Sequence, residues 1–293
     1  MKSVVILGAG GYIGSYLTKK LSKKYKLKVL LRHSKGAKNF RGLRHVKVFS
    51  GDILKTGDLE SVIRKGDVVI NLSGTTNVAQ ETRNHFDANV TGQHIVAEAC
   101  ARKEARVVFF STAHAYKNEK NPSKEIEGLH PQDIYSLSKK LAEEVYEFYS
   151  RTRDLSAMIF RLGSVYGPWH RKGVVFTMAQ SIKQRGVIEI PRQKVTRDFI
   201  YIDDVVRAVE KAIAHSAGGF NVFNIAGGTG HTLAHIAEMI CAITKRGTIV
   251  RVDKKSHPAT IHASIVKSKK ELNFKATVGL ETGLRRTLLS YKL

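Results

Sequence analysis

Short runs of apolar, mostly β-branched residues alternate along this chain with stretches in which apolar residues recur every three or four positions. The first run, Val4 to Leu7, is followed by Ile13, Leu17 and Leu21 at helical spacing. A short unbroken apolar run is typical of a strand buried on both faces, and the helical spacing is typical of an amphipathic helix. The chain is therefore predicted to begin with a strand and a helix.

The same alternation continues along most of the chain. Further strands are predicted at residues 27–31, 46–49, 67–72, 106–110, 158–162, 220–225 and 248–252. Helices are predicted at residues 59–63, 85–100, 135–149, 173–182, 205–214 and 233–243, with a short one near the end. Strands that alternate with helices predict an α/β fold with a doubly wound parallel sheet.

Length and composition are those of a globular protein. The 293 residues, 42% of them hydrophobic, suffice for one large domain or two smaller ones. No apolar run approaches the ~20 residues that span a bilayer, and the first strand leaves no room for a signal peptide. Cys100 and Cys241 are predicted to be buried thiols, and no Cys/His cluster has metal-ligand spacing. We therefore expect a cytoplasmic protein with no metal and no membrane partner.

The charge is strongly positive. Lys and Arg number 49 against 25 acidic residues, a formal net charge of +24. Such a surface attracts polyanions, so nucleic acid and anionic membranes are considered as partners. The densest stretches, residues 19–28 and 267–270, lack the repeated aromatic residues of a stacking platform. A solvated basic surface, which also suits anionic nucleotide substrates, is therefore favoured over a nucleic-acid interface.

Three glycines join the first strand to the first helix. Gly8, Gly11 and Gly14 follow one another at three-residue spacing. Strand, glycine turn and helix together are the dinucleotide-binding signature, because the glycines let backbone N–H groups approach a pyrophosphate. The helix N-terminus supplies partial positive charge to that anion. The alternative is a glycine-rich turn that binds no ligand.

The second strand ends at Arg32 and His33. At this place an acidic residue binds the ribose 2′-hydroxyl of NAD, whereas an arginine accommodates the 2′-phosphate of NADP. Arg32 therefore favours NADP, because a guanidinium binds phosphate through two parallel hydrogen bonds. Further basic residues nearby are Lys35, Lys38 and Arg41. The alternative is that Arg32 points to solvent and NAD binds without the acid.

Polar residues follow several predicted strands, at the edge where open α/β sheets bind ligands. Asp52 follows the third strand and is expected either to accept a hydrogen bond from the adenine amino group or to cap the next helix. Ser73 and Gly74 follow the fourth strand, and Ser111 and Thr112 follow the fifth. This edge is therefore the predicted ligand site.

A tyrosine and a lysine carry the candidate chemistry. Tyr135 and Lys139 are four residues apart, on one face of a predicted helix. A tyrosine hydroxyl has an unperturbed pKa of about 10, and a neighbouring ammonium with a bound nicotinamide cation is expected to lower it. Tyr135 then takes a proton from a substrate alcohol while hydride leaves to the nicotinamide. Thr112 holds the same oxygen, and Lys139 also bonds the nicotinamide ribose.

These segments together resemble an extended short-chain dehydrogenase/reductase of the NAD-dependent epimerase/dehydratase family, of the UDP-glucose 4-epimerase type. The resemblance covers nearly the whole chain. It rests on residues 8–14, 51–53, 67–74, 89–92, 111–112 with Tyr116, 135–139, 165–168, 197–205 and 224–227.

The resemblance assigns roles to individual residues. It implies a catalytic set of Thr112, Tyr135 and Lys139, with Asn89 in support. The cofactor contacts it implies are Gly8, Gly11, Tyr12, Ile13, Gly14, Arg32, His33, Asp52, Ile53, Leu72, Ser73, Gly74, Ser111, Tyr135, Lys139 and Leu162. The substrate contacts it implies are Thr112, Ser164, Arg197 and His257, with Arg197 on the substrate's diphosphate.

The resemblance also implies an architecture. A Rossmann dinucleotide-binding domain is expected at residues 1–167 plus about 198–227. A smaller α/β substrate-binding domain is expected at about 168–197 plus 228–293. Members of the family act on nucleotide sugars, often at C4, and are usually homodimers through the helices that carry Asn89 and Tyr135.

Some positions depart from the family pattern. Dehydratases carry Asp-Glu after the catalytic Thr, whereas this chain has Ala113 and His114, which disfavours sugar 4,6-dehydration. Ser164 stands where an Asn often touches substrate, and His257 where an Arg clamps the nucleotide phosphates. The family's Asp-x-Ser-Lys near the end reads Ser264-Ile-Val-Lys267, and Arg32 replaces the Asp of NAD-retaining epimerases.

Three functions are consistent with these features. The favoured one is an NAD(P)-dependent nucleotide-sugar 4-epimerase. The second is an NADPH-dependent nucleotide-sugar 4-ketoreductase of deoxysugar synthesis, for which Arg32 argues. The third is a basic RNA-binding or scaffold protein of the same fold, for which the charge argues. The presence of Thr112, Tyr135 and Lys139 favours an enzyme, because a binding module does not need them.

Overall fold

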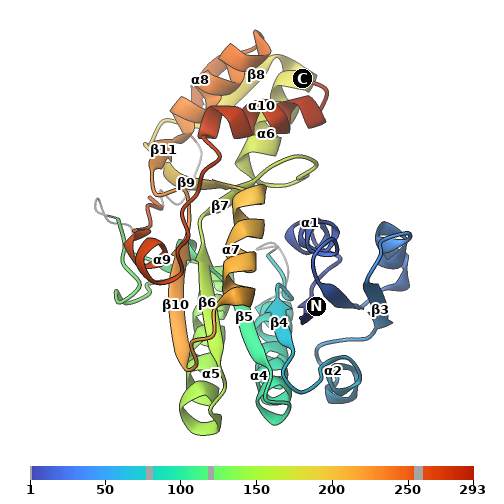
Figure 1. Ribbon diagram of the computed structural model, residues 1–293. Coiled ribbons are helices and arrows are strands. Elements are labelled where there is room, and N and C mark those ends of the chain that lie inside the picture. Colours follow the sequence, from blue (N-terminus) through green and yellow to red (C-terminus); the bar gives the residue numbers. More distant parts are fainter. Residues whose placement is uncertain (1, 77–81, 118–121, 254–259) are drawn as a thin grey trace. The chain divides into compact units, whose positions relative to one another are not determined.

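The computed structural model describes residues 2–76, 82–117, 122–253 and 260–293, and the chain divides into two compact units (Figure 1). The first unit comprises residues 1–115, 128–161 and 208–223, and the second residues 116–127, 162–207 and 224–293. The chain therefore enters each unit more than once. The domain limits expected from the sequence stay a prediction.

A seven-stranded sheet forms the centre of the fold, in the order β10-β6-β5-β4-β1-β2-β3. The strands are β1 (Ser3–Leu7), β2 (Lys26–Leu31), β3 (Val46–Ser50), β4 (Val68–Asn71), β5 (Arg106–Thr112), β6 (Ala157–Leu162) and β10 (Phe220–Ile225). β1 pairs in parallel with both β2 and β4. The chain order therefore reverses between β1 and β4, and at such a switch point open α/β sheets bind ligands.

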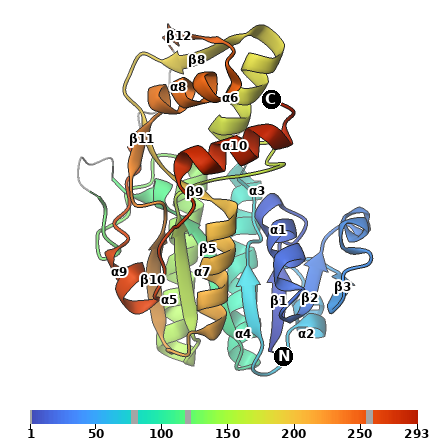
Figure 2. The same ribbon diagram turned by 45° about the horizontal axis from the view of Figure 1, so that its top comes forward.

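Helices cover both faces of this sheet. Those of the first unit, apart from short 3-10 turns, are α1 (Tyr12–Leu21), α2 (Thr56–Val62), α3 (Thr82–Phe86), α4 (Gly92–Arg102), α5 (Ile134–Arg153) and the end of α7 (Ile202–Ala214). In Figure 2, α1 and α7 lie in front of the strands and α4 and α5 behind them. On the α4/α5 side, Val5, Phe109 and Tyr146 belong to one continuous buried cluster. Each fully buried Val or Leu there contributes about 1.5–3 kcal/mol.

Helix α5 begins where its sequence provides a cap. The Asp133 carboxylate accepts a hydrogen bond from the Ser136 backbone N–H at 2.6 Å, and Ser136 Oγ accepts one from the Asp133 N–H at 3.3 Å. This reciprocal capping satisfies two of the N–H groups that a helix start leaves without partners. It places Tyr135 in the first turn of α5 and Lys139 one turn later.

The second unit contains a three-stranded and a two-stranded sheet. Its strands are β7 (Ser164–Tyr166), β8 (Val187–Pro191), β9 (Thr196–Tyr201), β11 (Gly230–Thr232) and β12 (Thr248–Val252), and its helices are α6 (Gly173–Arg185), α8 (Leu233–Thr244), α9 (Val266–Glu271) and α10 (Leu280–Ser290). β9 lies between β7 and β11, and β12 pairs with β8 in parallel. The buried Asp198 of β9 accepts hydrogen bonds from the backbone N–H of Gly228, which ties β9 to the segment before β11.

The doubly wound α/β fold predicted from the alternation of strands and helices is confirmed. The predicted helix over residues 85–100 differs, because α3 and α4 are joined by a π-helical turn, η2 (Asp87–Thr91). Cys100 is buried as expected, and burial raises the pKa of its thiol. Cys241 is only half-buried, so its predicted burial was wrong, because it lies beside the buried stripe of α8 that ends at Ile240.

Candidate functional site

The glycine turn connects β1 to α1 at the switch point of the sheet. Gly8 has a φ of +80°, which favours glycine, and its carbonyl accepts a hydrogen bond from the Gly11 N–H at 3.1 Å. A Cβ on Gly8 would lie 2.7 Å from the carbonyl of Leu72, and one on Gly14 would collide with the carbonyl oxygen of Gly8. The turn after β1 is therefore packed closely against the end of β4 and the start of α1.

The start of α1 fits a bound pyrophosphate. Gly11 is the N-cap residue and no side chain caps the helix, so its first N–H groups face no competing side-chain acceptor. No acidic residue lies in the first turn, where Tyr12 and Ile13 are half-buried. An anion at this end is stabilised by the helix dipole and by these N–H groups. The residues present thus fit a dinucleotide.

Replacing Gly14 with alanine tests how closely this turn is packed. Because the new methyl group meets backbone, which cannot move aside, we expect a loss of about 1–3 kcal/mol in the free energy of unfolding. Gly57 in α2 has open space around its Cβ position, so Gly57→Ala is the matched control and should be neutral or stabilising. Equal unfolding midpoints for the two variants would contradict the packing described.

Residues after β2 and β3 occupy the same edge of the sheet. Arg32 is exposed, and its Nε donates to Nε2 of His33 at 3.3 Å. Asp52 accepts a hydrogen bond from the Leu54 N–H at 3.1 Å, while α2 begins after Lys55 without a side-chain cap. The predicted capping of α2 by Asp52 was therefore wrong, because the local turn to Leu54 uses its carboxylate. Ile53 is half-buried.

Thr112 and Tyr135 meet at the end of β5. Thr112 is buried, and its side chain is hydrogen-bonded to the Tyr135 hydroxyl. Burial raises the pKa of Tyr135 to about 12, and the bond to Thr112 opposes that rise. The expectation that a neighbouring ammonium lowers this pKa is not met by the residues of the chain themselves, because desolvation has the larger effect.

Lys139 is held against β5. Its ammonium donates to the carbonyl of Phe110 at 2.7 Å and lies 4.5 Å from the centre of the Phe109 ring. Burial lowers the pKa of Lys139 to about 7, and the charge of Glu143 opposes that change. A cation above an aromatic face is attracted by the ring quadrupole, so Phe109 favours the charged form as well.

A buried ion pair lies one turn beyond Lys139. Glu143 of α5 accepts hydrogen bonds from Arg161 of β6, from Nε at 3.1 Å and from Nη2 at 2.7 Å. Ser111 Oγ also donates to this carboxylate. The side chains of Arg161 and Glu143 are only 8% and 5% exposed, so neither charge is solvated by water. No sequence pattern predicted this pair, because a Glu on a helix is ordinarily exposed.

Asn89 lies in the π-helical turn η2. Its Oδ1 accepts from the Thr75 N–H at 2.8 Å, and its Nδ2 donates to Ser138 Oγ at 2.9 Å. Gly74 has a φ of +133°, and a Cβ there would collide with Oδ1 of Asn89 and lie 3.8 Å from Nζ of Lys139. Gly74, Asn89 and Lys139 are thus contiguous, and π-helical turns often occur at functional sites.

A second polar network supports η2 from inside. Gln93 Nε2 donates to the carbonyl of Ala88 at 2.9 Å, and its Oε1 accepts from Asn71 at 2.6 Å and from Tyr146 at 3.0 Å. Ser73 donates to Oδ1 of Asn71 through both N and Oγ. Sequence reasoning did not select Asn71, Gln93 or Tyr146. The available signal was a polar side chain on the buried face of a predicted strand or helix.

Two predicted substrate contacts, Ser164 and Arg197, lie in the second unit, as does Leu162, a predicted cofactor contact, whereas Thr112 lies in the first unit. Leu162 is buried at the end of β6, and Ser164 is half-buried at the start of β7. Arg197 of β9 is half-buried and stands opposite His231 of β11 in the antiparallel pairing. Burial lowers the pKa of Arg197. His257 lies outside the described residues.

The described part of the chain contains no group of His, Cys, Asp and Glu that could hold a metal ion. Among the same residues, no helix combines the length and apolar character needed to cross a bilayer.

Fold and site together define a class. A doubly wound sheet with an uncapped helix after a glycine turn, and with Thr112 hydrogen-bonded to Tyr135 at the end of β5, is that of a dinucleotide-dependent short-chain dehydrogenase/reductase. The profile of the NAD dependent epimerase/dehydratase family matches residues 4–226. The chain belongs to this family, which confirms the predicted resemblance and an enzyme of this class.

Relatives match over nearly the full length of the chain. An uncharacterised UDP-glucose epimerase of Bacillus subtilis is 26% identical over 302 residues, covering 96% of this chain and 95% of its own. UDP-glucuronate 4-epimerase 1 of Arabidopsis thaliana is 27% identical over 330 residues, covering 99% of this chain and 76% of its own. Both are named for epimerisation of UDP-sugars.

Solved structures share the fold. A UDP-glucose 4-epimerase of Thermotoga maritima, crystallised with UDP-glucose, has a TM-score of 0.87 at 25% identity and covers 99% of this chain and 98% of its own. A UDP-glucuronic acid 4-epimerase of Bacillus cereus, in complex with a fluorinated substrate analogue and NAD, has a TM-score of 0.90 at 23% identity, with 99% of both chains covered. At 23% identity, the similarity to the Bacillus cereus structure shows a shared fold alone.

Proposed function

We propose that this protein is an NAD(P)-dependent nucleotide-sugar 4-epimerase in which Thr112, Tyr135 and Lys139 act at the sugar C4. The observation that carries the proposal is the hydrogen-bonded pair of Thr112 and Tyr135, set in the same unit as the uncapped start of α1. The names of the relatives, UDP-glucose and UDP-glucuronate 4-epimerases, support the substrate class.

Tyr135 is the proposed proton donor and acceptor of the site. A bound nicotinamide supplies the hydride acceptor of this chemistry. With a pKa raised to about 12, Tyr135 is protonated at neutral pH and donates a hydrogen bond to a substrate oxygen. To accept the proton of a C4 hydroxyl, its phenolate needs stabilisation from nearby positive charge. Thr112 donates to the same oxygen and fixes the substrate hydroxyl beside Tyr135.

Lys139 and Asn89 position the rest of the site. The Phe110 carbonyl and the Phe109 ring hold the ammonium of Lys139 in place, next to Asn89 and Gly74. A bound ribose hydroxyl would be recognised by this ammonium, and Asn89 keeps η2 in the shape that leaves room for it. In the second unit, the half-buried Arg197 is the proposed partner of the substrate's diphosphate.

A second candidate is an NADPH-dependent nucleotide-sugar 4-ketoreductase. The observation favouring it is the exposed Arg32 at the carboxyl end of β2, with His33 beside it. We propose NADP on this ground, although similar solved structures contain NAD.

A homodimer through α4 and α5 and a cytoplasmic location are further parts of the proposal.

The deciding experiment identifies the cofactor in freshly purified protein by heat release and mass spectrometry. Tightly held cofactor, together with interconversion of UDP-glucose and UDP-galactose or of the corresponding uronic acids, supports the epimerase. Protein that loses its cofactor and binds NADPH much better than NADH supports the ketoreductase. Failure to bind either nucleotide would refute both.

Arg32→Asp is expected to reverse the cofactor preference. Removing the guanidinium removes the partner of a 2′-phosphate, and the new carboxylate repels it, so NADPH affinity should fall at least tenfold while NADH affinity rises. Arg151→Asp, an exposed site on α5 with the same change of charge, is the control and should leave both affinities unchanged. Equal effects of the two variants on NADPH would show that Arg32 acts only through overall charge.

A further inference from the structure

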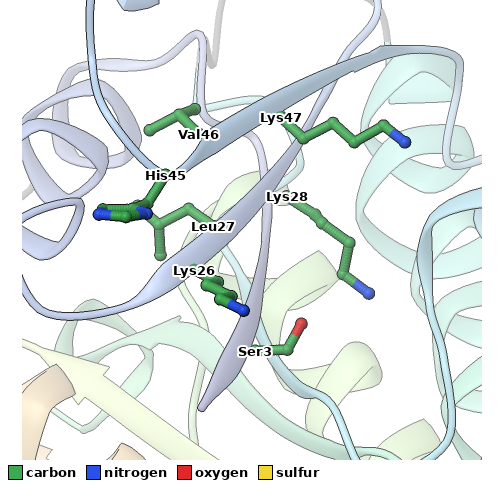
Figure 3. Close-up of a pocket in the computed structure, with 7 residues that line it drawn as sticks. All are labelled: Ser3, Lys26, Leu27, Lys28, His45, Val46 and Lys47. Carbon is green, nitrogen blue, oxygen red and sulfur yellow. The ribbon is translucent and has the colours of Figure 1, made fainter. Parts of the chain in front are cut away.

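A basic pocket lies at the amino-terminal ends of β1, β2 and β3, in the first unit (Figure 3). It has a volume of about 420 Å³. Its lining residues are Ser3, Lys26, Leu27, Lys28, His45, Val46 and Lys47. β2 spans about 20 Å at ~3.3 Å per residue, so this pocket is far from the glycine turn at the other end of the strands. The proposed epimerase chemistry makes no use of it.

Three lysines of the pocket are placed on one face of the sheet. Lys26 and Lys28 are two residues apart on β2, and Lys28 is paired in register with Lys47 of β3. Side chains two apart on a strand, or directly opposite on neighbouring strands, point to the same face. Figure 3 shows these three side chains and that of Ser3 extending to the same side of the strands. Like charges directly opposite one another destabilise a sheet.

One of the three charges has a counter-ion. Nζ of Lys28 lies 2.5 Å from Oδ2 of Asp67, which also accepts the Arg64 N–H at 2.7 Å. No acidic residue lines the pocket, and within the described part of the chain neither Lys26 nor Lys47 has an ion-pair partner. Among the described residues, Lys26 and Lys47 therefore have no carboxylate partner, and Nζ of Lys47 lies 5.1 Å from the centre of the Phe49 ring.

His45 adds a further basic group at the rim. It has a φ of +63°, an unusual conformation for a non-glycine residue, and its carbonyl accepts the Leu27 N–H at 2.7 Å. Figure 3 places its imidazole beside Leu27, across the strands from the three lysines. The pocket thus combines ammonium groups, a hydroxyl and an imidazole with no opposing carboxylate in its lining.

We propose that this pocket binds phosphate oxyanions, either those of a small polyphosphate or the successive phosphodiesters of a nucleic-acid strand. Lysine ammonium groups are strong point-charge partners of phosphate, and neither Lys26 nor Lys47 has a carboxylate partner in the described part of the chain. The volume is in the range of small-molecule sites. The site also gives a location to part of the net charge of +24, and it is independent of the proposed epimerase function.

The test uses the full-length protein saturated with NAD, so that the dinucleotide site is filled. Pyrophosphate is titrated at low salt, and acetylation of each lysine is followed by mass spectrometry of peptides. We expect pyrophosphate to slow the acetylation of Lys26 and Lys47 and to leave Lys103 and Lys211, which do not line the pocket, unchanged. Equal protection of all four lysines, or of none, would overturn the proposal.

Two double variants test which lysines contribute to the affinity for pyrophosphate. Lys26→Gln/Lys47→Gln is expected to weaken pyrophosphate binding, measured by calorimetry, roughly tenfold, since two exposed charge contacts are lost. Lys103→Gln/Lys211→Gln has the same charge change and is expected to bind as the wild type does. Equal losses in the two double variants would show attraction to overall charge only and would overturn the proposal.

The folded state provides an independent check. Because neither Lys26 nor Lys47 has an ion-pair partner in the described part of the chain, the first double variant is expected to keep the unfolding midpoint of the wild type. A lower midpoint would show that the two ammonium groups stabilise the fold and would contradict their assignment to ligand binding. Replacing pyrophosphate with a single-stranded RNA oligonucleotide distinguishes the sources. Protection of the two lysines at lower RNA than pyrophosphate concentration assigns the phosphate to nucleic acid, and the reverse order assigns it to a small molecule.

Discussion

Replacing Tyr135 with phenylalanine is expected to lower kcat by about 10²- to 10⁴-fold, the range over which general acid–base groups act. The ring and its packing in the first turn of α5 are kept, and only the hydroxyl bonded to Thr112 is lost. The substrate hydroxyl then has no group to take its proton, while the pyrophosphate contacts at α1 are untouched. Cofactor affinity should therefore change little.

The control for this change is Tyr149→Phe. Tyr149 lies on the same helix, is half-buried, and bonds through its hydroxyl to Nδ1 of His94 at 3.1 Å. It lies more than three helical turns from Tyr135, so its loss should leave kcat unchanged. Steady-state rates with UDP-glucose and UDP-glucuronate, together with cofactor affinities, measure both variants. A Tyr135→Phe enzyme with near wild-type kcat would show that another group moves the proton.

Replacing Glu143 with glutamine is expected to destabilise the protein by about 3–5 kcal/mol. The change removes the counter-charge of Arg161, whose side chain is only 8% exposed, and leaves its guanidinium buried without a carboxylate. The isosteric amide keeps the volume, so the cost is electrostatic rather than one of packing. The free energy of unfolding in urea measures it.

Glu144→Gln is the matched control for this substitution. Glu144 is the next residue on α5, its side chain is 55% exposed, and its ion pair with Lys140 is 3.8 Å long. An exposed pair of this kind contributes about 0–1 kcal/mol. The double variant Glu143→Gln/Arg161→Met removes both buried charges and should recover much of the stability lost in Glu143→Gln. Equal losses in Glu143→Gln and Glu144→Gln would show that the buried pair is not a special source of stability.

Glu143→Gln is also expected to change the pH range over which Lys139 titrates. The pKa of Lys139 in the folded protein is about 7, below its ordinary value of 10.5, and Glu143 is the carboxylate that raises it. Between these two values the unfolded chain holds the proton and the folded chain does not, so the contribution of Lys139 to the unfolding free energy rises with pH. Without Glu143 this rise should begin below pH 7, provided that Tyr135 stays protonated throughout. An unchanged onset would show that Glu143 does not act on Lys139.

The amino-acid sequence by itself determined the order of strands and helices around the central sheet. Strands buried on both faces need largely apolar runs, and each of β1, β2, β4, β5 and β6 overlaps a run that the pattern located. The glycine turn was also visible, because Gly8 and Gly14 meet backbone that no side chain could avoid. The positions of Thr112 and Tyr135, at a strand end and a helix start, followed from the same pattern.

Only the tertiary structure decided which buried polar groups meet. Glu143 and Arg161 are 18 residues apart in the chain, and Asn71 and Tyr146 are 75 apart, so no local spacing relates them. Their burial results from the packing of α4 and α5 on the sheet, where Gln93 also donates to the Ala88 carbonyl of the π-helical turn. The sequence predicted a continuous helix there, because these long-range hydrogen bonds leave no periodic signal.

The basic pocket shows the same division for surface charge. The sequence determined the excess of lysine and the alternation of Lys26 and Lys28 on one face of β2. The pairing register of β2 with β3 decided that Lys47 stands opposite Lys28, and the fold brought Asp67 to only one of the three. Composition therefore set the net charge, whereas strand register, which long-range pairing decides, set where that charge is concentrated.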